Sequence, residues 1–142
     1  MTYYIKFEIP GKVKAKQSVK FTSSGIKYTP ADVKSYANWV RLCFQKEYPK
    51  HLPSTYHEKQ LRMNIEVHYA IPKSFSKKKR EDALNRIVRP TVKPDCDNIS
   101  KNICDALNGI VYPDDKQIVS LEVEKYYSEN ESVIVRIYDS QK

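Results

Sequence analysis

Five aspartates are concentrated in the stretch between residues 93 and 115. They are Asp95, Asp97, Asp105, Asp114 and Asp115, and only Lys93 and Lys101 offset them. The stretch therefore has a net charge of −3, whereas the whole chain has a net charge of +8. Carboxylates supply the hard oxygen ligands that Mg²⁺ prefers, and a polyanionic substrate needs cations around such a site. This combination indicates a metal-dependent enzyme that acts on a polyanion.

The spacing of Asp95 and Asp97 suits a shared metal site. Pro94 favours extended backbone before it, and residues two apart in an extended run project to one side, about 6.5 Å apart. At that separation two carboxylates share one metal ion or flank two. Asp97 is also predicted to begin a helix that stops at Gly109 and buries Ile99, Ile103 and Leu107.

The predicted helix places Lys101 one turn beyond Asp97 on the same face. A lysine there pairs with the carboxylates, or stabilises negative charge that develops on a scissile phosphate. Asp105 continues this stripe, but two helical turns, about 12 Å, separate it from Asp97, so we assign it an outer or structural role. Asp114 and Asp115 are predicted to begin the next strand, where adjacent side chains point to opposite faces. One of these two should face the metal, and spacing does not say which.

The positive charge lies mainly in the N-terminal part of the chain. Residues 1–92 have a net charge of +12, whereas residues 116–142 have a net charge of −1. Two groups of cations are predicted to contact phosphates: Lys12, Lys14, Lys16 and Lys20 in an early loop, and Lys77, Lys78, Lys79 and Arg80 in the first turn of a helix capped by Ser76. Ordinary solvated segments would also explain either group. The overall charge and the eleven interspersed tyrosines favour nucleic acid.

The remaining sequence predicts a framework of about five strands and three helices. Alternating apolar residues predict strands over residues 3–9 and 61–69, and a C-terminal hairpin with strands at 119–123 and 133–137. A turn at residues 23–25 predicts an earlier hairpin. Thr29 and Pro30 predict the start of a helix that ends before Pro49. The helix that begins after Ser76 should carry Arg80, Leu84 and Ile87.

Composition excludes several classes of protein. A chain of 142 residues fits one domain spanning residues 1–142. Three cysteines without metal-ligand spacing indicate neither a disulfide framework nor a zinc site, which fits a reducing cytoplasm. No secretory pattern and no apolar run of about 18 residues is present, so we expect a cytoplasmic protein without membrane contact. The three histidines are isolated in the sequence and are assigned no chemistry.

The acidic stretch also resembles a known family. Its pattern, PD-x-DN-x-x-K-x-x-x-DAL-N-G followed by V-Y-x-DD-x-QI, covers residues 94–118. The segments PGK at residues 10–12 and YTP at residues 28–30 extend the likeness over most of the chain. These motifs resemble the RusA family of Holliday junction resolvases, found in bacteria and their prophages. Lysines stand here in place of that family's arginine-rich N-terminal loop.

The resemblance implies a homodimeric endonuclease that depends on Mg²⁺, with Mn²⁺ as a substitute, and resolves four-way DNA junctions by paired nicks. Carried over by position, the metal-binding aspartates are Asp95, Asp97 and Asp115, and the essential lysine is Lys101. The implied fold is α+β, a single domain with a small mixed β-sheet and about three helices packed on it. The expected chemistry is hydrolysis of a phosphodiester by metal-activated water, with Lys101 stabilising the developing charge.

Two other classes of function stay open. A non-catalytic basic nucleic-acid-binding module explains the net positive charge but not the acidic stretch, because carboxylates repel phosphate unless a cation intervenes. A metal-dependent phosphatase acting on small substrates explains the aspartates but not the basic half of the chain.

Overall fold

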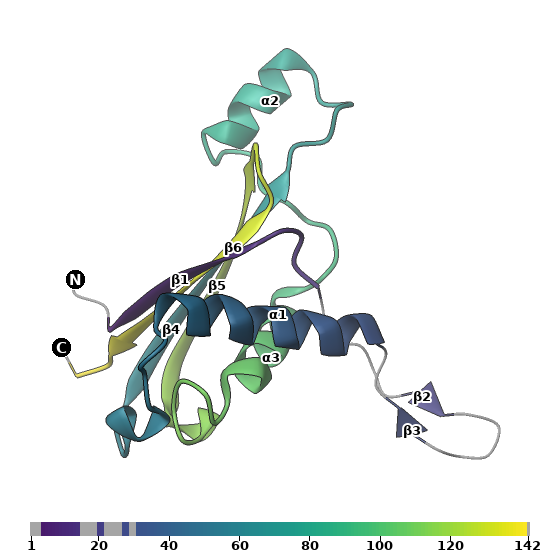
Figure 1. Cartoon of the computed structure of the whole chain (residues 1–142). Coiled ribbons are helices and arrows are strands. Elements are labelled where there is room, and N and C mark those ends of the chain that lie inside the picture. Colours follow the sequence, from purple (N-terminus) through teal and green to yellow (C-terminus); the bar gives the residue numbers. More distant parts are fainter. Residues whose placement is uncertain (1–3, 15–19, 22–26, 29–30, 142) are drawn as a thin grey trace. The chain divides into compact units, whose positions relative to one another are not determined.

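The computed structural model describes residues 4–14, 20–21, 27–28 and 31–141, and for residues 20–21, 27–28 and 31–35 the backbone alone (Figure 1). The chain divides into two compact units. Met1–Val13, Gln60–Lys93 and Ile118–Lys142 form the first, and Lys14–Lys59 and Pro94–Gln117 form the second. The described elements include a mixed four-stranded sheet and three α-helices, which confirms the predicted α+β class.

The first unit contains the four-stranded sheet. Its strands, in spatial order, are β1 (Ile5–Pro10), β6 (Ser132–Asp139), β4 (Leu61–Ala70) and β5 (Ile118–Ser128). β6 is antiparallel to both of its neighbours, whereas β4 and β5 run parallel, so the sheet is mixed. In Figure 1 the strands lie side by side, with β1 in purple and β6 in yellow.

Burial alternates along β1 and β4 as their sequences predicted. Along β4 every second side chain, beginning with Leu61, is buried, and the residues between are half-buried until Ala70. β1 buries Ile5, Phe7 and Ile9 and exposes the residues between them. β1 also lies at an edge of the sheet, and it ends at Pro10.

The predicted C-terminal hairpin is wrong. β5 and β6 follow each other in the chain, yet β4 lies between them, parallel to β5 and antiparallel to β6. Alternation of apolar residues identifies the buried face of a strand but not its neighbour, because both edges of every strand carry hydrogen-bonding groups. β5 therefore becomes an edge strand, and Val119 and Leu121 on its apolar face are 58% and 45% exposed.

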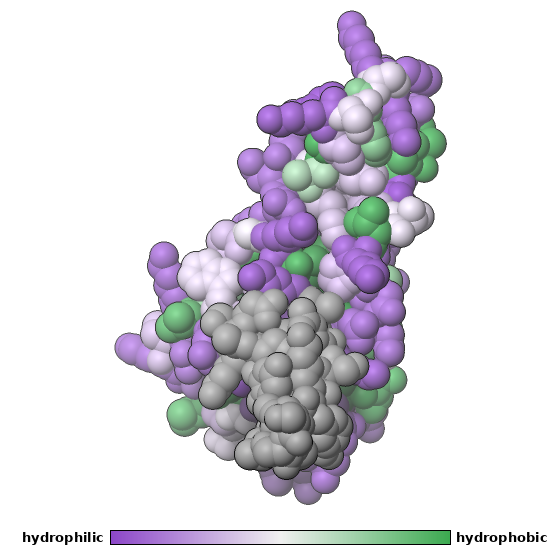
Figure 2. Space-filling model, turned by 90° about the vertical axis from the view of Figure 1, so that its right-hand side faces the viewer, coloured by the Kyte–Doolittle hydropathy of each residue, from purple (hydrophilic) through white to green (hydrophobic). Residues whose placement is uncertain are grey.

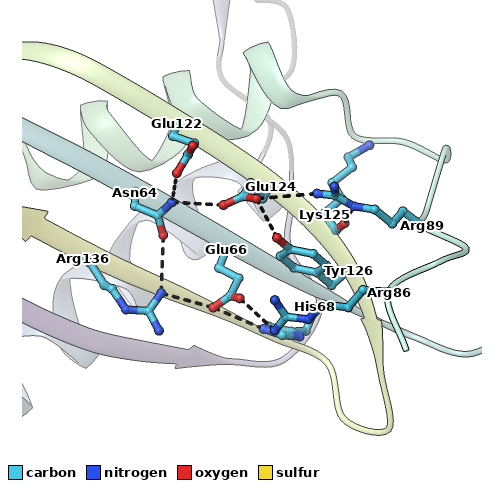
Figure 3. A network of polar contacts seen from close by, with 10 residues as sticks. All are labelled: Asn64, Glu66, His68, Arg86, Arg89, Glu122, Glu124, Lys125, Tyr126 and Arg136. Carbon is cyan, nitrogen blue, oxygen red and sulfur yellow. Dashed lines mark hydrogen bonds and ion pairs between the residues drawn. The ribbon is translucent and has the colours of Figure 1, made fainter. Parts of the chain in front are cut away.

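A network of polar side chains covers the other face of β4, β5 and β6 (Figure 3). The Asn64 amide donates to Glu122 Oε1 at 2.6 Å, and Arg136 donates to Glu66 Oε2 at 3.2 Å. The Tyr126 hydroxyl donates to Glu124 at 2.6 Å, and this hydrogen bond is the main cause of the lowered pKa of Glu124. The two glutamates of β5 are therefore partners within the sheet.

Helix α2 (Lys77–Leu84) begins as predicted: the Ser76 hydroxyl oxygen accepts a hydrogen bond from the Lys79 backbone N–H at 3.2 Å. The helix ends earlier than predicted, because Arg86 has a φ of 64° and Ile87 lies outside the helix, 71% exposed. At the top of the view in Figure 2, where α2 lies, long hydrophilic side chains and hydrophobic ones lie together. Arg89 Nε donates to the Lys125 carbonyl at 2.8 Å and joins the segment after α2 to β5.

The second unit contains the acidic stretch. Its elements are β2 (Lys20–Phe21), β3 (Lys27–Tyr28), α1 (Ala31–Glu47), a 3-10 helix (Pro53–Tyr56), α3 (Cys96–Leu107) and a 3-10 helix (Asp115–Gln117). β2 and β3 pair antiparallel, which confirms the early hairpin, although its turn at residues 23–25 and the helix start at Thr29 and Pro30 lie outside the described residues. α1 ends before Pro49, as predicted.

Helices α1 and α3 pack against each other. α1 buries Tyr36, Val40 and Phe44, whereas Trp39 is 42% exposed. Arg41 Nε on α1 donates to the Ala106 carbonyl on α3 at 2.9 Å. Among the described residues, no helix combines the length and the apolar character that crossing a membrane requires.

Candidate active site

Helix α3 begins with a capped turn that involves the first aspartate. Asp95 has extended backbone, with φ −75° and ψ 162°, and its Oδ1 accepts a hydrogen bond from the Asn98 backbone N–H at 2.9 Å. Aspartate is a favoured N-cap because its carboxylate satisfies a backbone N–H that the helix leaves unpaired. The helix starts at Cys96, so the prediction that Asp97 begins it is wrong by one residue.

The position of Asp97 differs from the extended geometry that its spacing suggested. Extended backbone stops at Asp95, and Asp97 lies in the first turn of α3. A negative side chain there is favourable beside the positive end of the helix dipole. The estimate of about 6.5 Å between the two carboxylates rested on strand geometry, so it does not apply.

Asp97 and Lys101 form the predicted ion pair on the surface of α3. Lys101 Nζ lies 3.3 Å from Asp97 Oδ2, and the side chains are 60% and 74% exposed. An exposed pair at this spacing contributes about 0.5 kcal/mol to stability. The pair places an ammonium group beside a carboxylate at little energetic cost, and either group is accessible to a substrate.

Asp114 and Asp115 lie in a tight turn and do not begin a strand. α3 stops at Leu107, Gly109 follows with φ 76°, and the buried Val111 and Tyr112 lead the chain back. Asp115–Gln117 is a 3-10 helix, and β5 begins only at Ile118. The prediction that the two aspartates point to opposite faces of a strand is therefore wrong.

Asp114 caps this 3-10 helix. Its Oδ1 accepts a hydrogen bond from the Lys116 backbone N–H at 3.0 Å, and its carbonyl accepts one from the Gln117 N–H at 3.1 Å. A side-chain acceptor of this kind satisfies a backbone N–H that has no carbonyl partner at the start of a helix. Asp114 therefore has a structural role as the cap of the 3-10 helix, of which Asp115 is the first residue.

Asp105, Asp114 and Asp115 interact electrostatically. Burial raises the pKa of the Asp115 carboxyl above its ordinary value, and its hydrogen bond with Asp114 and the negative charges of Asp114 and Asp105 raise it further. Burial also raises the pKa of the Cys104 thiol to about 12, with contributions from the charges of Asp115 and Asp105. These carboxylates repel one another, which favours a cation nearby.

Sequence reasoning did not predict the electrostatic interaction between Asp105 and Asp115. Its separation from Asp97 along the helix was correctly inferred, but the chain reverses at Gly109 and returns beside the end of α3. The Gly109 N–H donates to the Tyr112 carbonyl at 2.9 Å, and the Tyr112 hydroxyl donates to the Cys104 carbonyl at 3.2 Å. The signal in the sequence was the stop of the helix at Gly109, because Asp114 and Asp115 follow it within six residues and the reversed chain brings them back toward Asp105.

The structure does not bring the three expected metal ligands into one recognised site. Within the part of the chain that it describes, no group of three or more His, Cys, Asp or Glu side chains is arranged to hold a metal ion. The donor atoms themselves are carboxylate oxygens, which fit a hard divalent cation. Asp95, Asp97 and Asp115 as a ligand set therefore stay a prediction.

The predicted phosphate contacts are only partly described. Lys12 and Lys14 are exposed, the Lys14 carbonyl accepts from Asn102 Nδ2 at 2.7 Å, and Lys16 and the side chain of Lys20 lie outside the description. On α2, Lys78 lies 3.1 Å from Asp82, Arg80 lies 3.7 Å from Glu129, and Lys79 Nζ lies 4.2 Å from the centre of the Phe75 ring. Lys77 is exposed at the start of the helix.

Comparison with known proteins identifies the family. The family model described as endodeoxyribonuclease RusA matches residues 10–138. The chain belongs to the RusA endodeoxyribonuclease family. It is also 42% identical, over 110 residues, to the uncharacterized protein YqaN of Bacillus subtilis strain 168, an alignment that covers 76% of this chain and 75% of that one.

The RusA match includes both acidic segments of the second unit and helix α2 of the first. It confirms the resemblance that the sequence motifs indicated. It also places the chain among endodeoxyribonucleases.

Sequence reasoning missed two side chains that hold together the segments of the second unit around the acidic stretch. His51 Nε2 lies 2.7 Å from the Val111 carbonyl, and Asn102, 3% exposed, anchors Lys14 to α3.

The raised pKa of Asp115 predicts how the metal-free fold responds to pH. The folded protein holds this proton more tightly than the unfolded chain, so stability falls as pH rises from the ordinary value of 3.8 through the folded pKa. Asp115→Asn removes this cost. We expect the variant to be more stable than the wild type at pH 7 in EDTA, by on the order of 0.5 kcal/mol, with the difference vanishing below about pH 3.

Urea denaturation across that pH range measures the effect. Asp97→Asn is the matched control, and it should give no such gain, because it removes the partner of Lys101. A loss of stability at pH 7 in Asp115→Asn would contradict the electrostatic account of this turn.

Proposed function

We propose that the chain is a Mg²⁺-dependent endodeoxyribonuclease that resolves four-way DNA junctions by paired nicks. The observation that carries this proposal is the RusA family match over residues 10–138, which spans the whole acidic stretch. The net charge of +8 supports it, because a polyanionic substrate requires cations around the site. The proposal places the protein in DNA recombination and repair, in the cytoplasm, with branched DNA as its substrate.

Asp95, Asp97 and Asp115 are the residues proposed to hold the metal ion, with Mn²⁺ as a substitute for Mg²⁺. When bound, the ion would lower the pKa of a water molecule and neutralise charge on the phosphate. The mutual repulsion of Asp105, Asp114 and Asp115 supports this assignment, because a cation nearby would relieve it. The capping role of Asp114 also supports Asp115 as the ligand of the adjacent pair.

Lys101 is proposed to stabilise the negative charge that develops on the phosphate during hydrolysis. Its ammonium group pairs with Asp97 at 3.3 Å, and both side chains are exposed. Because an exposed ion pair is weak, the ammonium can exchange the carboxylate for a phosphate oxygen at little cost. Charge stabilisation in the transition state raises the rate without a matching gain in affinity.

The two groups of cations are proposed to hold the DNA backbone. Lys12, Lys14, Lys16 and Lys20 form one group, and Lys77, Lys78, Lys79 and Arg80 form the other. The second group supports the proposal most clearly, because four cations in the first turn of α2 oppose the helix dipole. A phosphate beside that turn would offset the unfavourable interaction.

The aspartate variants test the metal site. We expect Asp95→Asn, Asp97→Asn and Asp115→Asn each to abolish cleavage of a synthetic four-way junction and to bind it at least as tightly as wild type. Each change weakens a hard-oxygen ligand set and removes negative charge beside the DNA. Cleavage is measured on gels with Mg²⁺ and with EDTA, and binding by gel shift without metal.

The exposed Glu47 on α1 offers a matched control in the same unit. Glu47→Gln makes the same carboxylate-to-amide change and should cleave normally. Loss of binding in all three aspartate variants would contradict the metal assignment and indicate a folding role. Junction binding by the wild type without cleavage at any Mg²⁺ concentration would favour the basic nucleic-acid-binding module.

The Lys101→Ala variant tests the role of the lysine. We expect the cleavage rate at saturating enzyme to fall about 10²-fold or more, with little change in junction affinity. Single-turnover cleavage and gel shifts measure the two quantities separately. Lys50→Ala, at an exposed position in the same unit, is the control. Equal losses of rate and affinity would make Lys101 an ordinary phosphate contact.

The functional enzyme is proposed to be a homodimer. One chain has one acidic site, whereas junction resolution requires cuts in two opposed strands, and a two-fold dimer presents two equivalent sites to a nearly two-fold substrate. A mixed dimer of wild-type and Asp115→Asn subunits should nick a supercoiled plasmid that carries an extruded cruciform, whereas the wild-type dimer linearises it. Equal linearisation by stable mixed dimers would exclude two independent sites.

A further inference from the structure

One side chain attaches the turn that contains Asp114 and Asp115, the acidic turn, to the rest of the second unit. Gln117 Oε1 accepts a hydrogen bond from the Asp114 backbone N–H at 3.2 Å. Gln117 Nε2 donates to the Tyr56 carbonyl at 2.6 Å and to the Lys59 carbonyl at 3.2 Å. The acidic turn is thereby joined to the chain that follows the 3-10 helix Pro53–Tyr56.

The first of these contacts completes a reciprocal cap. Asp114 precedes the 3-10 helix and accepts from the Lys116 N–H, while Gln117, three residues later, reaches back to the Asp114 N–H. This resembles a capping box, in which two backbone N–H groups are satisfied at once, except that the Asp114 carboxylate accepts from the second helical residue and not from the third. These hydrogen bonds hold the Asp114 carboxylate in the cap, and Asp115 follows as the first residue of the 3-10 helix.

The other contacts explain why the residue is an amide. The position needs an acceptor for one N–H and two donors for two carbonyls on a single side-chain end. Among the side chains only Asn and Gln combine a carbonyl with an NH₂ group, and a glutamate would place negative charge against two carbonyl oxygens. All three backbone partners would lose a hydrogen bond in an apolar variant.

A second attachment holds the same loop from its other end. His51 Nε2 lies 2.7 Å from the Val111 carbonyl, and the His51 ring lies 5.0 Å from that of Tyr56, which is 8% exposed. The loop between α3 and β5 is therefore fixed on both sides of Asp114 and Asp115. Such restraint opposes the repulsion among the neighbouring carboxylates.

We infer that Gln117 is a positioning residue for the proposed metal site: it fixes the Asp114–Asp115 turn so that the Asp115 carboxylate is held ready for a divalent cation. The inference rests on the proposed function. Side chains that orient metal ligands typically change metal affinity 10- to 100-fold when they are removed. A residue that only stabilised the fold would not change metal affinity in protein that remains folded.

Gln117→Met tests the inference, since it removes all three hydrogen bonds and keeps the length of the side chain. Gln45→Met, at an exposed position on α1, is the matched control. We expect Gln117→Met to bind Mn²⁺ about tenfold more weakly or worse, measured by electron paramagnetic resonance on DNA-free protein. Exchange of the Asp114 amide proton, followed by NMR, should accelerate, and cleavage should need about tenfold more Mg²⁺ but recover at saturating Mg²⁺.

Junction binding without metal should be unchanged in both methionine variants. Gln117→Asn, which keeps the amide but shortens its reach, gives a milder change in the same direction and serves if Gln117→Met does not fold. The inference alone would be overturned if the wild type binds Mn²⁺, Asp115→Asn loses that binding, and the folded Gln117 variants bind Mn²⁺ as tightly as the wild type. Absence of an Asp115-dependent Mn²⁺ site in the wild type would overturn the proposed metal set, and the inference with it.

Discussion

Burial of one face of α3 is the interaction on which the candidate site depends. Ile99, Ile103 and Leu107 are fully buried, and burial of each such side chain stabilises the fold by about 2 kcal/mol. Arg41 adds a hydrogen bond from α1 near the end of the helix. These contacts fix the rotation of α3 about its axis, so that Asp97, Lys101 and Asp105 on the remaining face are exposed to solvent.

The second constraint is the reversal of the chain after α3. Gly109 adopts a positive φ that glycine tolerates without strain, and Tyr112 returns into the unit with its ring fully buried. Because this ring is held beneath Cys104 by a hydrogen bond, the next residues must pass close to Asp105. Packing of an aromatic side chain thus determines where the charges of Asp114 and Asp115 lie.

The sequence predicted the elements with strong periodicity and failed where geometry depends on distant partners. The spacing of Ile99, Ile103 and Leu107 identified α3 and its buried face, and alternation identified β4 and its faces. The order of the strands could not be deduced, because the apolar pattern of β5 would be the same whether β4 or β6 were its neighbour. The Asp97–Lys101 pair was predictable because helix geometry alone creates it.

The structure of the acidic turn could not be predicted from the local sequence, for a different reason. Asp114 and Asp115 precede a clear strand pattern, and their capping turn depends on hydrogen bonds from Gln117 to carbonyl groups 61 and 58 residues earlier in the chain. Repulsion between Asp105 and Asp115 likewise arises only after the chain has reversed. Local spacing gave the residue types of the candidate site, whereas long-range packing decided which of them are neighbours.

The strand order also determines when this protein can fold during its synthesis. Every pairing in the four-stranded sheet involves β5 or β6, because β1 pairs with β6, and β4 pairs with β5 and β6. A nascent chain that ends between residues 70 and 118 therefore contains two apolar strands, β1 and β4, that have no native neighbour in this sheet. Ribosomes add about 5–20 residues per second. Several seconds therefore pass between the synthesis of β4 and that of β5, its first neighbour in the sheet. Such a long-range topology folds slowly, and that interval is when a chaperone would be needed most.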